Sequence, residues 1–254
     1  MPDVIRLDQV TIRYGDAVAV ENVTATIPAG ASVAIIGSNG SGKSTLLKGI
    51  AGIVRPDSGS IDVFDHTISL VLQSTEIDNS VPLSVRDTVT MARYAHLGLF
   101  GRLQQQDRDA VDATLSSLDL GHLVDHQIHH LSGGQRQRAF VAQGLAQEAD
   151  VLLLDEPMTG LDLVSRSLID AALDQARLAG RTTVVTTHSF TEAEACDLVL
   201  LLASRCVAFG PPHEVITEAN LREAFGGHVI RVGSTLALDD PHHDREPATH
   251  VDVD

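Results

Sequence analysis

The sequence predicts an α/β fold in which a mostly parallel sheet is covered by helices on both faces. Short, nearly continuous apolar runs alternate with helical segments, and runs of this kind suit strands that are buried on both faces. A glycine-rich loop also joins the first of these runs to a helix-forming segment. The predicted buried strands are residues 33–36, 69–72, 151–154, 182–186 and 198–201.

The glycine-rich loop matches the phosphate-binding P-loop pattern at every fixed position. Its glycines, Gly37, Gly40 and Gly42, would let backbone N–H groups converge on phosphates at the start of a helix. Lys43 would reach the β- and γ-phosphates, and the Ser44 hydroxyl would bind Mg²⁺. Taken alone, the pattern leaves open a glycine-rich turn without a ligand. The predicted ATP-binding stretch is Gly37-Ser38-Asn39-Gly40-Ser41-Gly42-Lys43-Ser44-Thr45.

The segments around the buried strands predict three further parts of the fold. Runs of β-type residues at 10–14 and 17–20, joined by a Gly15-Asp16 turn, predict an antiparallel layer before the P-loop. A helix at 165–179 has one apolar face and is ended by Gly180. Residues 104–120 and 132–149 are helical in pattern. The predicted division is an α/β core at about 1–73 and 150–233, a helical subdomain at about 74–149, and an acidic, His-containing, disordered tail at 234–254.

The composition favours a globular cytosolic protein. The net charge of −16, with scattered basic residues, argues against nucleic-acid binding. No apolar run reaches the length of a membrane span, and the N-terminus lacks the pattern of a secretory signal. Cys196 and Cys206 form no metal-binding or redox pattern, so reduced thiols are expected.

An Asp-Glu pair at the end of a predicted buried strand supplies candidate catalytic carboxylates. Asp155 would lie beside the Mg²⁺ shell and Glu156 near an attacking water. A solvated turn is the alternative for such a pair, but its position after a P-loop favours chemistry.

One stretch of the sequence resembles a specific protein family. It is identical to the signature of the ATP-binding cassette (ABC) family and consists of Leu131-Ser132-Gly133-Gly134-Gln135. Four other positions resemble family motifs in the expected order. Tyr14 matches the aromatic residue that stacks on adenine, and Gln73 the glutamine that links the γ-phosphate and the metal to the permease. Asp162 matches the D-loop that crosses to the opposite subunit, and His188 the switch histidine that contacts the γ-phosphate.

The resemblance covers about residues 4–232 and implies a P-loop NTPase (RecA-like) core with an antiparallel β subdomain and an inserted α-helical subdomain. It also implies an ATP hydrolase that works as a head-to-tail homodimer, in which the signature of one subunit closes the P-loop site of the other. Glu156, His188 and Gln73 would then be catalytic, and Ser44, Gln73 and Asp155 would hold Mg²⁺.

The segments 74–98 and 219–227 resemble ATPase subunits of bacterial manganese, zinc and iron importers. This implies integral membrane permease subunits, an extracytoplasmic metal-binding protein in the full complex, and a location at the cytoplasmic face of the membrane. Residues 76–85 are candidates for contact with the permease, or alternatively for packing within the helical subdomain. Gln143 and Gly160 depart from the residues common in the family, at positions outside its motifs.

Other functions stay open at this stage. An importer ATPase for chelated iron or a small organic nutrient has the same motifs, and a regulatory cassette protein could use ATP without transport. A metal-buffering role would depend on the tail, where His242, His243 and His250 lie among acidic residues.

Overall fold

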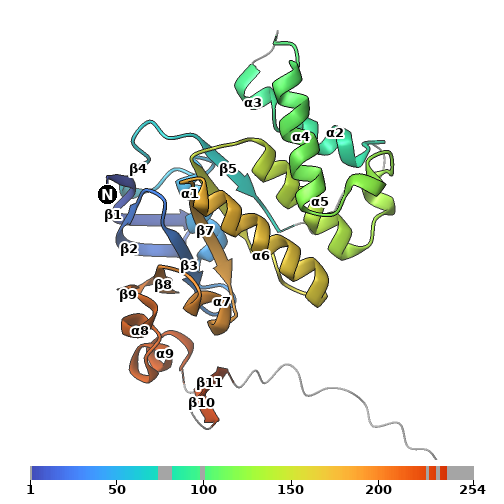
Figure 1. Cartoon of the computed structure of the whole chain (residues 1–254). Helices are drawn as coiled ribbons and strands as arrows, with labels where there is room; N and C mark the ends of the chain where they lie inside the picture. Colours follow the sequence, from blue (N-terminus) through green and yellow to red (C-terminus); the bar gives the residue numbers. More distant parts are fainter. Residues whose placement is uncertain (1, 74–81, 98–100, 227–228, 233–234, 239–254) are drawn as a thin grey trace, which may run out of the picture.

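The computed structural model describes residues 2–73, 82–97, 101–226, 229–232 and 235–238. Its centre is a nine-stranded sheet with the order β4-β1-β2-β9-β8-β3-β7-β6-β5 (Figure 1). From β8 to β5, neighbouring strands are parallel, whereas β1 pairs with β2 and β4 in antiparallel fashion. The strands of this sheet are β1 Asp3–Tyr14, β2 Ala17–Pro28, β3 Ser32–Ile36, β4 Ser58–Asp62, β5 Ile68–Val71, β6 Val151–Asp155, β7 Thr182–Thr187, β8 Leu198–Ala203 and β9 Arg205–Gly210.

The antiparallel layer is much longer than the two short predicted runs. β1 and β2 have 12 residues each, and register shifts interrupt their pairing. Gln9 and Asn22 have positive φ angles of 48° and 50°, and their N–H groups bond to the hydroxyls of Thr24 and Thr11. These irregularities break the alternation of apolar and polar residues that sequence patterns rely on.

The parallel strands separate two hydrophobic cores. All five residues of β6 are buried: Val151 and Leu153 face a cluster with helix α1 (Lys43–Ile50), and Leu152 and Leu154 face the helical subdomain. A strand that is covered on both faces has a nearly continuous apolar sequence, which explains why β6 was predicted well from the sequence.

The helical subdomain lies to one side of the sheet (Figure 1). Apolar residues of α2, α4 and α5 form one cluster with α6 and the adjacent sheet face. Val85 starts α2 and is fully buried in this cluster, which favours the alternative that it packs within the helical subdomain. Residues 76–81 of the segment considered for permease contact lie outside the described part. The helices are α2 Val85–Met91, α3 Tyr94–Leu97, α4 Gln105–Ser117, two 3₁₀ turns at Gly121–Leu123 and Ile128–His130, α5 Gly133–Ala146 and α6 Leu163–Leu178.

The C-terminal part packs on β3 and β8 and continues past the predicted boundary at residue 233. A two-stranded hairpin pairs β10 with β11, so residues 235–238 form a strand rather than the start of a disordered tail. The runs Val-Ile-Arg-Val and Thr-Leu-Ala-Leu are strand-forming, and the acidic composition of the residues that follow obscured them. The remaining elements are α7 Phe190–Glu194, α8 Pro212–Val215, α9 Glu218–Phe225, β10 Val229–Val232 and β11 Thr235–Leu238.

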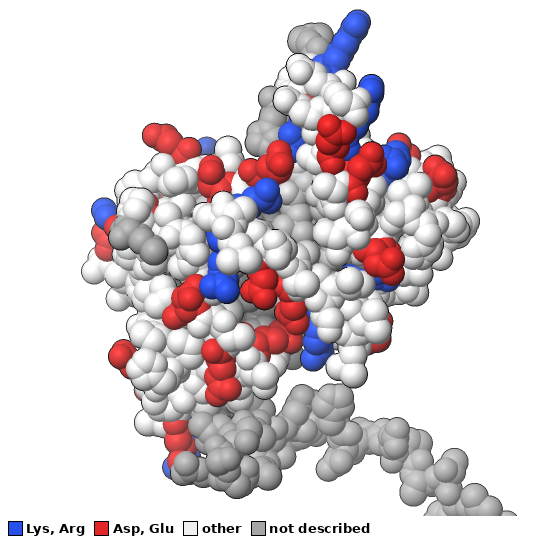
Figure 2. All heavy atoms as spheres, in the orientation of Figure 1, with Lys and Arg blue, Asp and Glu red and all other residues white. Residues whose placement is uncertain are grey.

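Among the described residues, no helix combines the length and the apolar composition that crossing a bilayer requires. Figure 2 shows acidic and basic side chains interspersed over one face of the protein, without a continuous basic patch on that face.

Candidate active site

The P-loop packs closely against neighbouring strands because two of its positions are glycines, which have no Cβ atom. A Cβ atom on Gly37 would lie 2.1 Å from the carbonyl oxygen of Leu202, and one on Gly42 would lie 2.3 Å from that of Ala19. Gly42 also has a φ of 95°, which favours glycine. The loop is therefore held tightly between β2, β3 and β8, and helix α1 begins directly after it at Lys43.

One cleft of 340 Å³ gathers most of the residues that the sequence predicts to bind ATP. Tyr14, at the end of β1, is 53% exposed and forms part of its wall. Gln73 and Glu156 also line it, although they are distant in sequence from the P-loop. The lining residues are Tyr14, Ala19, Asn39, Gly40, Ser41, Gly42, Lys43, Ser44, Thr45, Gln73 and Glu156.

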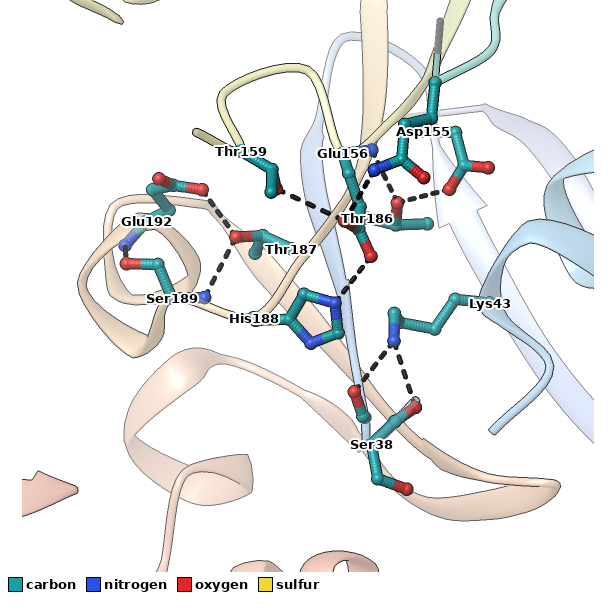
Figure 3. A network of polar contacts seen from close by, with 12 residues as sticks. Ser38, Lys43, Asp155, Glu156, Thr159, Thr186, Thr187, His188, Ser189 and Glu192 are labelled. Atoms are coloured by element: carbon teal, nitrogen blue, oxygen red, sulfur yellow. Dashed lines mark hydrogen bonds and ion pairs between the residues drawn. The ribbon is translucent and has the colours of Figure 1, made fainter. Parts of the chain in front are cut away.

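Lys43 lies buried at the base of the cleft. Its ammonium group donates hydrogen bonds to the carbonyl oxygens of Gly37 at 2.8 Å and Ser38 at 3.1 Å (Figure 3). Burial lowers the pKa of the Lys43 ammonium, and the carboxylates of Glu156 and Asp155 oppose that shift. The side chain is thus a desolvated cation held by the loop's own backbone, which suits recognition of a phosphate charge.

Asp155 and Glu156 occupy different environments at the carboxyl end of β6. Asp155 is buried, and its Oδ1 accepts a hydrogen bond of 2.7 Å from the hydroxyl of Thr186 on β7. The same hydroxyl accepts the N–H of Glu156 at 2.9 Å. Glu156 has a φ of 48°, unusual for a residue other than glycine, and such strained positions occur often at functional sites. Thr186 therefore fixes the turn that separates the two carboxylates.

The Glu156 carboxylate is the centre of the polar network in Figure 3. His188 Nε2 lies 2.5 Å from its Oε1. The amide of Gln73 and the hydroxyl of Thr159 donate to its Oε2 at 3.3 Å and 3.2 Å. The structure thus joins three elements that the sequence separates: the glutamine after β5, the carboxylate after β6 and the histidine after β7. This is the expected result of parallel strands whose carboxyl ends share one edge.

The signature stretch lies outside the P-loop cleft. Ser132 caps α5 by accepting the N–H of Gln135 at 3.3 Å, while the Gln135 side chain accepts the N–H of Ser132 at 3.0 Å. Leu131 is buried in the core of the helical subdomain, so any contact it makes with a partner's nucleotide would use its backbone. Gly133 lines a second cleft of 180 Å³ together with Gln73 and Glu156.

Asp162 of the predicted D-loop packs against this signature. It caps α6 and accepts hydrogen bonds from the N–H and hydroxyl of Ser165 at 2.8 Å and 2.9 Å, which lower the pKa of its carboxyl. A Cβ atom on Gly134 would lie 2.7 Å from the Ser165 hydroxyl and 3.1 Å from the Asp162 carboxylate. The start of the signature helix and the D-loop are therefore closely packed against each other.

The residues of the cleft fit a nucleotide and a magnesium ion. A Cβ atom on Gly37 or Gly42 would collide with the backbone of β8 or β2, so glycine permits this close packing of the loop, and the buried Ser41 hydroxyl has no hydrogen-bond partner within the described residues. The Ser44 hydroxyl, the Gln73 amide and the Glu156 carboxylate all line the cleft, and oxygen donors of this kind suit Mg²⁺.

Several residues of the site were not predicted from the sequence. Thr186 and Thr159 each hold a predicted functional side chain in place. Thr186 could have been suspected, because it lies in the strand that ends at His188. Thr159 could not, because its role depends on the turn at Glu156.

The comparisons with known proteins agree with this geometry. The family model of the ABC transporter matches residues 20–159. The manganese transport system ATP-binding protein of Listeria monocytogenes is 36% identical over 230 residues, which cover 87% of this chain and 96% of that protein. The zinc transport system ATP-binding protein of Treponema pallidum is 36% identical over 240 residues, covering 91% of this chain and 89% of the relative.

A solved structure supports the same conclusion. An inward-facing ABC transporter described as of the metal-chelate type matches with a TM-score of 0.78 and 32% identity, covering 89% of each chain. The fold class predicted from the sequence is thereby confirmed. The family match and the length of these similarities show that this chain is an ATPase of the ABC transporter family.

Proposed function

We propose that this chain is the ATP-hydrolysing subunit of an importer for a divalent metal ion, with zinc or manganese favoured. The observation that carries the proposal is the single cleft that brings the P-loop together with Tyr14, Gln73 and Glu156. The relatives named as manganese and zinc transport proteins supply the substrate class.

In the proposed mechanism, the P-loop N–H groups and Lys43 bind the phosphates. Mg²⁺, when bound, would be held by Ser44, Gln73 and Asp155 and would neutralise charge on the phosphates. Glu156 takes a proton from the attacking water, and His188 holds the Glu156 carboxylate in place before contacting the γ-phosphate.

A homodimer would complete the site. The signature lies outside the P-loop cleft of its own chain, so a second copy must supply it to the nucleotide. Leu163 and Val164 follow Asp162 directly and are 80% and 67% exposed. Apolar residues this exposed, next to the signature and D-loop surface, suit burial against that second copy.

The permease would dock in a groove of 530 Å³ between the end of β5 and helices α2 and α5. Leu72 and Met91 are 43% and 50% exposed there, and Gln143 also lines the groove. Gln73 lines both this groove and the ATP cleft. A docked permease and a bound nucleotide would therefore both contact the Gln73 side chain. In this proposal the subunit lies at the cytoplasmic face of the membrane, and an extracytoplasmic metal-binding protein acts on the other side.

The metal itself is tested by uptake. In cells whose own copy is replaced by the Glu156→Gln variant, zinc and manganese contents are measured under limitation of each metal, with the wild-type gene as control. Loss of one metal, rescued when that metal is supplied, supports the proposal and identifies the cargo. Normal contents of both metals would favour an importer for chelated iron or another nutrient, or a regulatory cassette protein.

Tyr14 is expected to stack on adenine. Tyr14→Ala should raise the Kd for ATP about tenfold, because base stacking on an aromatic ring contributes about 1–3 kcal/mol. Tyr14→Phe should retain wild-type affinity, and Tyr94→Ala, at a half-exposed tyrosine outside the cleft, serves as the matched control. Equal loss of affinity for inorganic tripolyphosphate would contradict stacking, because that ligand has no base.

The lowered pKa of Lys43 predicts weaker ATP binding at alkaline pH. Binding requires the charged ammonium, and a group whose folded pKa is depressed loses its proton earlier than free lysine as pH rises. The same shift means that the unfolded state binds the proton more tightly, so this group's contribution to the free energy of unfolding increases as pH rises through the folded pKa.

The Kd for a slowly hydrolysed ATP analogue should therefore rise as the pH increases toward the ordinary lysine pKa of about 10.4. Lys48 is the other lysine of the chain, and Lys48→Arg should leave the profile unchanged. Lys43→Arg should flatten it. A profile that is flat in the parent protein would show that Lys43 does not titrate in this range.

A further inference from the structure

A second polar network lies behind the switch histidine, at the end of β7 and the start of α7 (Figure 3). The buried Thr187 hydroxyl donates a 2.5 Å hydrogen bond to Oε2 of Glu192 and accepts the N–H of Ser189 at 3.0 Å. Thr187 and Ser189, which these hydrogen bonds involve, are the residues immediately before and after His188. One hydroxyl therefore fixes the backbone on both sides of the histidine.

Glu192 connects this network to the rest of the fold without entering the ATP cleft. Its side chain is 21% exposed, and its Oε1 lies 3.9 Å from the Arg166 guanidinium of α6. Its N–H donates to the Ser189 hydroxyl at 3.3 Å. Glu192 also lines a cavity of 470 Å³ between α6 and α7, whose lining includes no residue of the P-loop.

We propose that Glu192, acting through Thr187, is the positioning residue of the switch histidine. The inference rests on the proposed role of His188 in hydrolysis. The His188 ring is 34% exposed and contacts Glu156 through Nε2, so the orientation of the ring depends strongly on the backbone that carries it. Small displacements of a catalytic group cost much of its effect, and rigid support by neighbouring hydrogen bonds prevents them.

A role in capping α7 alone does not account for the network. Ser189 already caps that helix through its own hydroxyl. The Thr187 to Glu192 bond instead ties the last residue of β7 to the first turn of α7 across the histidine. Helix capping predicts a loss of stability, whereas positioning predicts a loss of turnover that depends on His188.

The test compares Thr187→Val with Thr187→Ser in the full chain. Valine has nearly the shape of threonine but lacks the hydroxyl, so Thr187→Val should lower kcat about tenfold while the Kd for ATP stays within about twofold. Thr187→Ser, which keeps the hydroxyl, should restore most of the rate, and Glu192→Ala, which removes the acceptor of the Thr187 hydroxyl, should lower kcat like Thr187→Val. Thr183→Val, at another buried threonine of β7, is the matched control and should keep the wild-type rate.

A double-mutant cycle separates positioning from stability. In a His188→Ala background, Thr187→Val should cause no further loss of kcat. Additive losses, or a wild-type rate for Thr187→Val, would overturn the inference while leaving the role of His188 intact. A wild-type rate for His188→Ala alone would instead overturn the proposed role of the histidine, and the inference with it.

Discussion

Glu156→Gln is expected to lower kcat for ATP hydrolysis by about 10²–10⁴-fold, the contribution typical of a general base. Glutamine has the same shape and can still accept the hydrogen bonds from Gln73 and Thr159, but it cannot take a proton from water. ATP binding should stay within a few-fold of wild type, because the phosphates are bound mainly by the P-loop and Lys43. Steady-state hydrolysis and equilibrium binding on the same preparation measure the two effects separately.

A matched control and a second readout sharpen this prediction. Glu194→Gln removes an exposed carboxylate from α7 and should leave the rate unchanged. If the signature of a second copy closes the site, the Glu156→Gln variant should also accumulate as an ATP-dependent dimer in size-exclusion chromatography. A hydrolysis rate close to wild type would show that another group activates the water.

Arg93→Met is expected to lower the free energy of unfolding by about 3–5 kcal/mol, the cost of breaking a buried ion pair on one side. The Arg93 side chain is 8% exposed and lies 3.0 Å from the Asp107 carboxylate, which is 3% exposed. It also pairs with Glu148 at 2.6 Å and donates to the carbonyl oxygen of Ala146 at 2.8 Å. One guanidinium thus joins the segment after α2, the first turn of α4 and the end of α5.

Denaturant unfolding measures this loss, and the exposed pair of Arg205 with Glu223 supplies the control. These side chains are 57% and 47% exposed, so Arg205→Met should cost at most about 1 kcal/mol. Adding Asp107→Leu to Arg93→Met should recover part of the stability, because it removes the carboxylate that would otherwise stay buried without its arginine. Equal losses of unfolding free energy for Arg93→Met and Arg205→Met would contradict the conclusion that the buried Arg93 ion pair stabilises the fold more than the exposed pair does.

Sequence patterns predicted those elements whose environment is uniform along the chain. The parallel strands are buried on both faces and read as apolar runs, and α6 buries Ile169, Ala172 and Ala176 at helical spacing. The positive φ of Gly180, after the end of this helix, agrees with its predicted role as the stop signal. In each case the local residues and the tertiary environment favour the same structure.

Patterns failed where distant contacts decide the local conformation. The predicted helix at 132–149 ends at Ala146, where Arg93 binds the carbonyl oxygen and Glu148 adopts a φ of 53°. Bulges in β1 and β2 break the alternation of apolar and polar residues, so the sequence predicted only short runs where the structure has two long strands. A side chain from elsewhere in the chain satisfies a backbone group at the altered position in both cases, and local periodicity carries no information about it.

The sequence by itself determined the chemistry of the candidate site: the P-loop, the Asp-Glu pair and the signature are contiguous motifs whose residue types imply phosphate binding and hydrolysis. The tertiary structure decided how they meet. Parallel strands bring Gln73, Glu156 and His188 to one edge of the sheet, the turn at Glu156 brings in Thr159, and the signature is left outside its own cleft. Contacts between residues far apart along the chain arise only on folding, because strand order and turn geometry, rather than residue type, set which side chains become neighbours.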